Sequence, residues 1–134
     1  MLTPDAIRQR VRTSLRQQRE LVAELLRRRE LLAGSLFVRY GVCGKQGCVC
    51  RTGQKHGPYY VLSTRSGGQG GFAYLEAARM SEARELVKAY RDYRAGMRRL
   101  RRVNAELVTL LRRYQEATTK RGSRRVGLAL RVQI

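Results

Sequence analysis

The strongest constraint on the fold is an unbroken periodic pattern in the second half of the chain. Side chains suited to a helix interface recur there at alternating spacings of four and three, at Leu86, Tyr90, Tyr93, Met97, Leu100, Asn104, Leu107, Leu111 and Tyr114. An α-helix brings positions with this spacing onto one side, and the same spacing is typical of a coiled coil. We therefore expect residues 76–118 to form a long helix whose seam, residues 86–114, packs against another helix.

The first 34 residues carry the signals of a second helix. Thr3 can accept a hydrogen bond from a free backbone N–H, Pro4 fits the first helical position, and Asp5 suits the positive end of the helix dipole. Nonpolar residues follow at Val11, Leu15, Val22, Leu25 and Leu32, and Gln18 and Arg29 interrupt the row. Because Gly34 is a suitable C-cap, we expect a helix over residues 4–33.

The seam of residues 86–114 has two candidate partners. The first helix can lie antiparallel against it within one chain, or a second copy of the chain can supply the matching seam of a homodimer. Asn104 distinguishes the two, because an amide inside a nonpolar seam costs stability unless it is hydrogen-bonded. An Asn from a second copy would supply the partner and fix the register. A homodimer through this seam is our working prediction.

The net charge narrows the class of partner. Twenty-nine lysines and arginines against ten acidic residues give a formal charge of +19 and an isoelectric point near 11.3. The excess is +4 in residues 1–34 and +5 in each of the ranges 35–75, 76–118 and 119–134. Because positive charge is spread over every segment, we expect a polyanionic partner that contacts an extended surface and not a single pocket.

Hydropathy and cysteine content indicate the compartment. The longest uncharged stretches, such as residues 31–38, are far shorter than the roughly 20 residues that cross a bilayer, so no membrane span is predicted. Three cysteines are an odd number for a disulfide framework, and the chain starts with no nonpolar signal segment. We therefore expect a cytoplasmic protein.

Residues 35–75 differ in composition from both helices, because glycine, β-branched and aromatic residues are frequent there. Residues 36–40, 59–64 and 72–75 predict three short strands, and a glycine-rich turn around residues 66–71 joins the last two. Three such strands bury little nonpolar surface, so a segment of this size needs an additional staple. The predicted fold class is α+β: a long N-terminal helix, a small three-stranded β module, and a long C-terminal coiled-coil-like helix.

The staple is predicted from the pattern C-x4-C-x-C-x5-H, formed by Cys43, Cys48, Cys50 and His56. Three thiolates and one imidazole satisfy the tetrahedral preference of Zn²⁺. Glycines between the ligands allow the sharp turns that make the sulfurs converge. The prediction is a structural Zn²⁺ site, and the alternatives are three reduced thiols with a loop histidine, a redox-active pair, or an iron–sulfur cluster.

The surroundings of this pattern argue against an enzyme. Residues 35–75 contain five basic residues and no Asp or Glu, so no carboxylate stands nearby to act as the base of a hydrolytic zinc site. His56 is the only histidine, and once it binds a metal no histidine remains as a general base. Cysteine catalysis with His56 is a minor alternative. We predict a non-enzymatic protein.

The same residues resemble a known family. They are Gly34, Ser35 and Leu36, then Tyr40, then Cys43, Gly44 and Lys45 with Cys48 and Cys50, then His56, Gly57, Pro58, Tyr59 and Tyr60. They are similar to a domain-of-unknown-function family of prokaryotic and mobile-element proteins, in which a CGK-x-x-C-x-C module followed by HGPYY and a strand pair lies between helices. The resemblance covers roughly residues 34–94. It implies that the three cysteines and the histidine act as one unit, and it implies no activity.

Basic and aromatic residues favour a nucleic acid as the polyanion. In the long helix the candidate contacts are Arg91, Arg94, Arg98, Arg101 and Arg102, and Asp92 is the only acid between Lys88 and Arg102. In the β module they are Arg39, Lys45, Arg51, Lys55, Arg65, Tyr59 and Tyr60. The two tyrosines either pack against the metal module or the helices, or serve as stacking platforms for bases or sugars. Residues 119–134 are expected to be a basic tail that is either solvated or tracks phosphates.

The favoured function is therefore that of a zinc-stabilised, basic nucleic-acid-binding protein. DNA is favoured over RNA, because long paired helices suit a rigid duplex. The alternative is an oligomerising protein–protein adaptor of a phage or mobile-element complex, and an RNA-binding protein is the third candidate. An enzyme acting on nucleic acid would depend on Glu76, Glu82 or Glu85, the carboxylates that follow the third strand.

Overall fold

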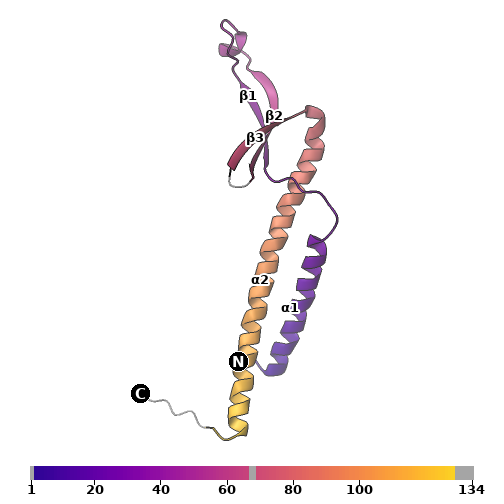
Figure 1. The fold of residues 1–134 in the computed structure, drawn as a ribbon, viewed down its shortest axis with the longest axis vertical. Helices are drawn as coiled ribbons and strands as arrows, with labels where there is room; N and C mark the ends of the chain where they lie inside the picture. Colours follow the sequence, from indigo (N-terminus) through magenta and orange to yellow (C-terminus); the bar gives the residue numbers. More distant parts are fainter. Residues whose placement is uncertain (1, 67–68, 129–134) are drawn as a thin grey trace, which may run out of the picture. The chain divides into compact units, whose positions relative to one another are not determined.

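A computed structural model describes residues 2–66 and 69–128 of the chain, the side chains of residues 65–69 excepted. Its helices and strands follow the order α1 (Pro4–Leu25), β1 (Ser35–Gly41), β2 (His56–Ser66), β3 (Gln69–Leu75) and α2 (Met80–Arg125), with short 3-10 helices η1 (Val49–Arg51) and η2 (Ala77–Arg79) (Figure 1). This confirms the predicted α+β class with a three-stranded module between two helices. Within the described residues, neither helix has the length and hydropathy of a membrane-spanning segment.

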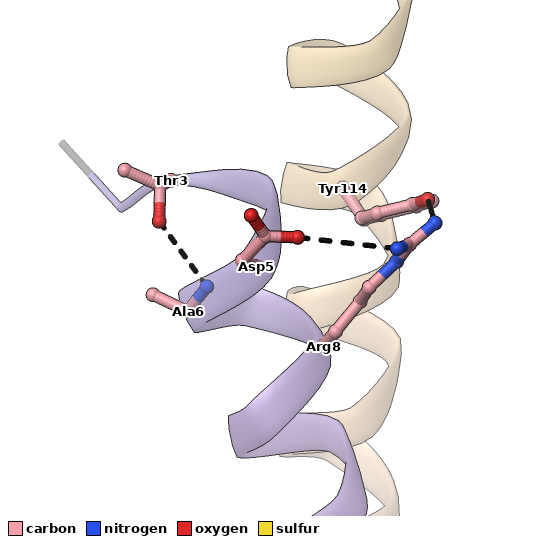
Figure 2. A network of polar contacts seen from close by, with 5 residues as sticks. All are labelled: Thr3, Asp5, Ala6, Arg8 and Tyr114. Carbon is pink, nitrogen blue, oxygen red and sulfur yellow. Dashed lines mark hydrogen bonds and ion pairs between the residues drawn. The ribbon is translucent and has the colours of Figure 1, made fainter.

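The chain divides into two units, and the first consists of α1 and the part of α2 from Arg94 onward. The two helices lie antiparallel, and Figure 2 shows their contact near the start of α1. There Arg8 Nη2 donates to the Tyr114 hydroxyl of α2 at 2.9 Å, and Arg8 Nη1 lies 3.9 Å from Asp5 Oδ1 within α1. The predicted cap is present, because Thr3 Oγ1 accepts from the backbone N–H of Ala6 at 3.2 Å. Ile7, Ser14, Leu107 and Leu110 are the buried residues of this helical hairpin.

Asn104 finds its partner inside the chain. Gln18 Nε2 donates to Asn104 Oδ1 at 2.8 Å, so the glutamine that interrupts the nonpolar row of the first helix meets the amide that interrupts the second. The antiparallel alternative therefore accounts for Asn104 without a second copy of the chain. Asn104 is no longer evidence for a dimer, which stays a prediction.

The buried side of α2 is rotated away from part of the predicted seam. Leu107 and Leu110 are buried, whereas Leu111, a predicted seam residue, is 54% exposed. A repeat of 3.5 residues drifts by about 20° per heptad around a straight helix of 3.6 residues per turn. The full row of residues 86–114 therefore does not stay on one side of α2.

The first helix is shorter than residues 4–33. It ends at Leu25 with Leu26 as C-cap, and the chain then leaves the helix. The backbone N–H of Leu32 donates to the Leu86 carbonyl at 3.1 Å, and the Arg29 guanidinium lies 5.9 Å from the Tyr93 ring. Tertiary contacts with α2 thus replace the helix that the nonpolar spacing predicts for residues 26–33.

The second helix is longer than residues 76–118 and continues to Arg125. The hydroxyls of Thr118 and Thr119 donate to the carbonyls of Tyr114 and Gln115 at 2.8 and 2.7 Å, so both threonines fit inside the helix. Leu128 N–H then bonds to the Ser123 carbonyl, and Gly127, at φ 69°, bonds to that of Arg124, which together form a Schellman motif. The prediction of a tail beginning at residue 119 is therefore wrong for residues 119–125, and residues 129–134 lie outside the described chain.

The second unit, Arg28–Tyr93, contains the sheet. The strands pair antiparallel in the order β1-β2-β3 and confirm the three predicted strands, with wider bounds. Among the described side chains of this unit, the buried ones are those of Cys50, Val61, Leu62, Met80, Ala83 and Val87. This core is small, and one of its members is a cysteine of the predicted metal site.

The chain enters the sheet through Gly34, at a position whose backbone conformation only glycine adopts without strain. Its φ is 140°, and a Cβ there would meet the Ser63 carbonyl oxygen and, at 2.9 Å, the Leu62 side chain. We predict that Gly34→Ala lowers the free energy of unfolding by about 2 kcal/mol or more, as measured by urea denaturation. Gly70→Ala is the control, because nothing lies within 4 Å of its Cβ position. Equal effects of the two substitutions would contradict the prediction.

Candidate metal centre

A bulge at one end of the sheet aims His56 at the cysteines. Along β1, Arg39 pairs with Tyr59 and Gly41 pairs with His56, so β2 has one residue more than β1 in this interval. The additional length is accommodated by Gly57 and Pro58, since Gly57 has φ 137° and Pro58 needs no N–H partner. His56 therefore lies beside Gly41, the last residue of β1, and Cys43 follows Gly41 by two residues.

The other two cysteines come from the loop between β1 and β2. Cys48 is the N-cap of η1, and Cys50 lies inside η1. Gly47, at φ 76°, makes the turn that precedes Cys48. Sheet pairing thus positions His56 beside Gly41, from which the loop leads to Cys43, and a single short helical turn positions Cys48 and Cys50.

The four ligand atoms form a compact cluster, all within 4.8 Å of one another. The Sγ atoms of Cys43 and Cys50 are 3.5 Å apart, and Cys48 Sγ lies 3.3 Å from His56 Nε2. Tetrahedral bonds of about 2.3 Å to sulfur and about 2.0 Å to nitrogen place neighbouring ligand atoms roughly 3.5–3.8 Å apart, so the spacing matches a metal site. A disulfide would need about 2.05 Å, and all three cysteines are free.

The thiols differ in acidity. The backbone N–H of Cys50, followed by hydrogen bonds with Cys50, Cys43 and His56, lowers the pKa of Cys48 from 9.0 to about 6. The backbone N–H of Cys43 lowers the pKa of Cys50, but burial and the neighbouring sulfurs of Cys48 and Cys43 outweigh this and raise it. Cys48 is therefore a thiolate at neutral pH, and Cys50 needs a cation close by to lose its proton.

Charge and burial suit a bound cation. Cys50 is only 2% exposed, and the Cys43 backbone N–H donates to its sulfur at 3.4 Å, an interaction that supports a coordinating thiolate. Lys45, Arg51 and Lys55 are exposed around the cluster. Three thiolates with one divalent ion carry a net charge of −1, which these basic side chains balance.

The predicted nucleic-acid contacts of the module lie in different places. Arg39 is exposed on β1, and its Nη1 donates to the Tyr74 hydroxyl at 3.1 Å. Lys45, Arg51 and Lys55 belong to the metal loop. Tyr59 is exposed and Tyr60 is half-buried, and as neighbours in a strand they point to opposite sides of the sheet. The side chain of Arg65 lies outside the described residues.

The predicted contacts of the long helix are all exposed on α2, at Arg91, Arg94, Arg98, Arg101 and Arg102. In the described part of the chain, none of these five forms a salt bridge, whereas Lys88 and Asp92 pair with each other at 3.5 Å. Their positive charge is consequently available to an external anion.

On one face of the sheet, three exposed aromatic residues were not among the predicted site residues. Phe37, Phe72 and Tyr74 join Tyr59 and Arg39 on one face of the sheet, as the strand register shows. The sequence indicated that Phe37 and Arg39 share one side of their strand and that Phe72 and Tyr74 share one side of theirs, because side chains two residues apart point to the same face. Which face stays open depends on tertiary packing, which the alternation does not encode.

Comparison with known proteins finds one family. The family model of a domain of unknown function (DUF6788) matches residues 11–85, which is more than half of the 134 residues. The match includes the metal cluster and begins within α1, earlier than the resemblance over residues 34–94. The chain matches no curated protein and no solved structure.

The geometry predicts that each chain binds one Zn²⁺ through four ligands. Native mass spectrometry of the zinc-loaded protein should show one ion per chain, and the ion should be lost in Cys50→Ser and in His56→Ala. Zinc affinity should fall more steeply with pH below about 6, because the proton then competes for the Cys48 thiolate as well as for Cys50. Val49→Ala, at an exposed position of η1, is the control and should keep the ion. Unchanged zinc content in both ligand variants would refute the site.

Proposed function

The chain belongs to the DUF6788 family, and we propose that it is a zinc-stabilised, non-enzymatic protein that binds nucleic acid, with DNA favoured over RNA. The proposal has two parts. A metal holds the small β module together, and basic side chains of α2 neutralise backbone phosphates.

The donor set supports zinc in a structural role. Four protein ligands, three sulfurs and one nitrogen, fill a tetrahedral coordination shell and leave no position for a reacting water molecule. The segment of residues 35–75 also has no carboxylate that could act as a base. The metal would then stabilise the loop between β1 and β2 without taking part in a reaction.

The unpaired arginines of α2 are the observation on which the proposal of nucleic-acid binding rests. Arg94, Arg98, Arg101 and Arg102 lie within about 12 Å of helix axis, and like charges three or four residues apart repel one another. A duplex presents one phosphate per roughly 1.7 Å of its axis, so a helix of this kind meets several phosphates at once. Binding would relieve the repulsion and release counterions. DNA is preferred because regularly spaced arginines on a rigid helix suit the regular phosphate lattice of a duplex.

This function predicts steeply salt-dependent binding to duplex DNA of random sequence. Each phosphate contact contributes about −0.9 to the slope of log affinity against log salt concentration. In the triple variant Arg94→Gln, Arg98→Gln, Arg101→Gln, the salt dependence should become shallower, with the magnitude of the slope smaller by about 2–3, as measured by fluorescence anisotropy. The variant Arg79→Gln, which removes a partner of Glu82, is the control and should change the slope little. Absence of duplex binding even at low salt would refute the function and favour the adaptor alternative.

We also propose that the protein is a homodimer. Leu15 on α1 and Val108 and Leu111 on α2 are about half exposed. On α1, Leu15 lies on the same side as Gln18, and on α2, Val108 and Leu111 lie on the same side as Asn104. The hydrogen bond between Gln18 and Asn104 joins these two rows of residues into one face of the hairpin. Two copies related by a twofold axis would bring matching nonpolar rows together and set each amide pair against its equivalent.

Sedimentation velocity tests the homodimer. The wild-type protein should sediment as a dimer, and the double variant Leu15→Lys, Leu111→Lys as a monomer, because buried unpaired ammonium groups are costly. Val126→Lys is a control at an exposed nonpolar position outside these rows. A monomeric wild type would contradict the proposal.

A further inference from the structure

One face of the sheet carries four aromatic side chains around a buried valine. Phe37, Val61 and Tyr74 are direct partners across the three strands, so their side chains share a face. By the same register Arg39 pairs with Tyr59, and Phe72 with Ser63, on that face. We call Phe37, Arg39, Tyr59, Phe72 and Tyr74 the aromatic face.

The rings of the aromatic face are exposed to an unusual degree. Phe72 is 72% exposed and Tyr74 is 63% exposed, and Phe37 and Tyr59 are also exposed. Val61, at the centre, is 2% exposed, so the rings surround and cover it. The opposite face carries Leu62, which is buried. Exposed nonpolar patches of this kind mark binding surfaces, since they cost free energy when they face water.

The rings meet edge to face and are not stacked on one another. Phe37 and Phe72 meet edge to face, with centroids 6.3 Å apart and planes at 88°. Tyr59 and Tyr74 do the same at 6.3 Å and 78°. Arg39 is held beside them by its bond to the Tyr74 hydroxyl. In each pair one ring offers only its edge to the other, so ring surfaces stay available to a flat ligand.

A pocket adjoins this face on the side of the metal centre. Its volume is about 410 Å³, and its walls are formed by Arg39, Gly41, Val42, Cys43, Tyr59 and Tyr74. Among its walls Arg39 carries a positive charge and Cys43 belongs to the metal cluster, and the whole segment of residues 35–75 contains no Asp or Glu. An anionic ligand with flat nonpolar groups therefore complements both the charge and the shape of this surface.

We propose that the aromatic face binds the unpaired bases of single-stranded nucleic acid, with Phe72, Tyr74 and Tyr59 as stacking platforms and Arg39 on the sugar–phosphate backbone. The inference rests on the proposed nucleic-acid function and adds the substrate class. Aromatic side chains on an open sheet stack on unpaired bases, and stacking tolerates any base sequence. The bases of an intact duplex are stacked inside it and cannot reach these rings. The face thus recognises exposed bases, whereas the arginines of α2 contact phosphates in single and double strands alike.

The test compares three labelled ligands of equal length on the zinc-loaded full chain: oligothymidylate of about 12 nucleotides, the same strand with abasic sites throughout, and a duplex. The abasic strand keeps the phosphates and lacks the bases. We expect wild-type protein to bind oligothymidylate at least about tenfold more tightly than the abasic strand. Phe72→Leu with Tyr74→Leu should remove most of this preference and leave the duplex affinity unchanged. Phe72→Trp should retain it, and Val38→Leu, on the opposite face, is the matched control.

The outcomes distinguish failure of the aromatic face as a base-binding site from failure of the nucleic-acid function. Equal binding of oligothymidylate and the abasic strand by wild-type protein overturns the aromatic face as a base-binding site, even where the duplex binds. Equal loss of oligothymidylate and abasic-strand affinity in the Phe72→Leu, Tyr74→Leu variant also overturns it, because stacking on bases is then not what was removed. If the Phe72→Leu, Tyr74→Leu variant binds all three ligands as the wild type does but changes its self-association in sedimentation, the aromatic face is a protein contact and the proposal is overturned. No binding of any strand at low salt overturns the nucleic-acid function itself.

Discussion

Three sulfurs and one imidazole converge at the end of a small sheet, and we propose that the second unit depends on this interaction. The described core of that unit consists of six side chains, and Cys50 is among the least exposed of them. Three strands with this little buried area are marginal by themselves, and a metal ion held by the four ligands would supply what nonpolar burial does not. The backbone N–H of Cys43 lowers the pKa of Cys50, but burial, followed by the sulfurs of Cys48 and Cys43, outweighs it and raises that pKa, so a thiolate at this position favours a cation close by.

The sequence was sufficient for the elements whose cause is local. Thr3, Pro4 and Asp5 predict the start of α1, the alternating strands predict the sheet, and the cysteine spacing predicts the cluster. Predictions failed where long-range contacts decide. Leu32 leaves the helix to bond with Leu86. The partner of Asn104 was open for the same reason, since Gln18 is 86 residues away in the sequence. The continuation of α2 beyond residue 118 is different, because the Thr119 hydroxyl bonds locally to the Gln115 carbonyl four residues earlier.

Two kinds of surface chemistry lie on different units. The exposed arginines from Arg94 onward belong to the helical hairpin, whereas the exposed rings belong to the sheet. Phosphate contacts supply affinity with little selectivity, and ring stacking distinguishes exposed bases from paired ones. If both proposals hold, the chain combines general attraction to nucleic acid with a preference for regions where the duplex is open.

The bulge at Gly57 and Pro58 links the metal ligand to the aromatic side of the sheet. Because side chains alternate along a strand, removing one residue between His56 and Tyr59 would turn the imidazole to the opposite side while the tyrosine kept its place. The length of the HGPYY segment is therefore constrained together with the identities of His56, which belongs to the ligand cluster, and Gly57, whose φ is 137°. Insertions and deletions should be purged there during the evolution of the family.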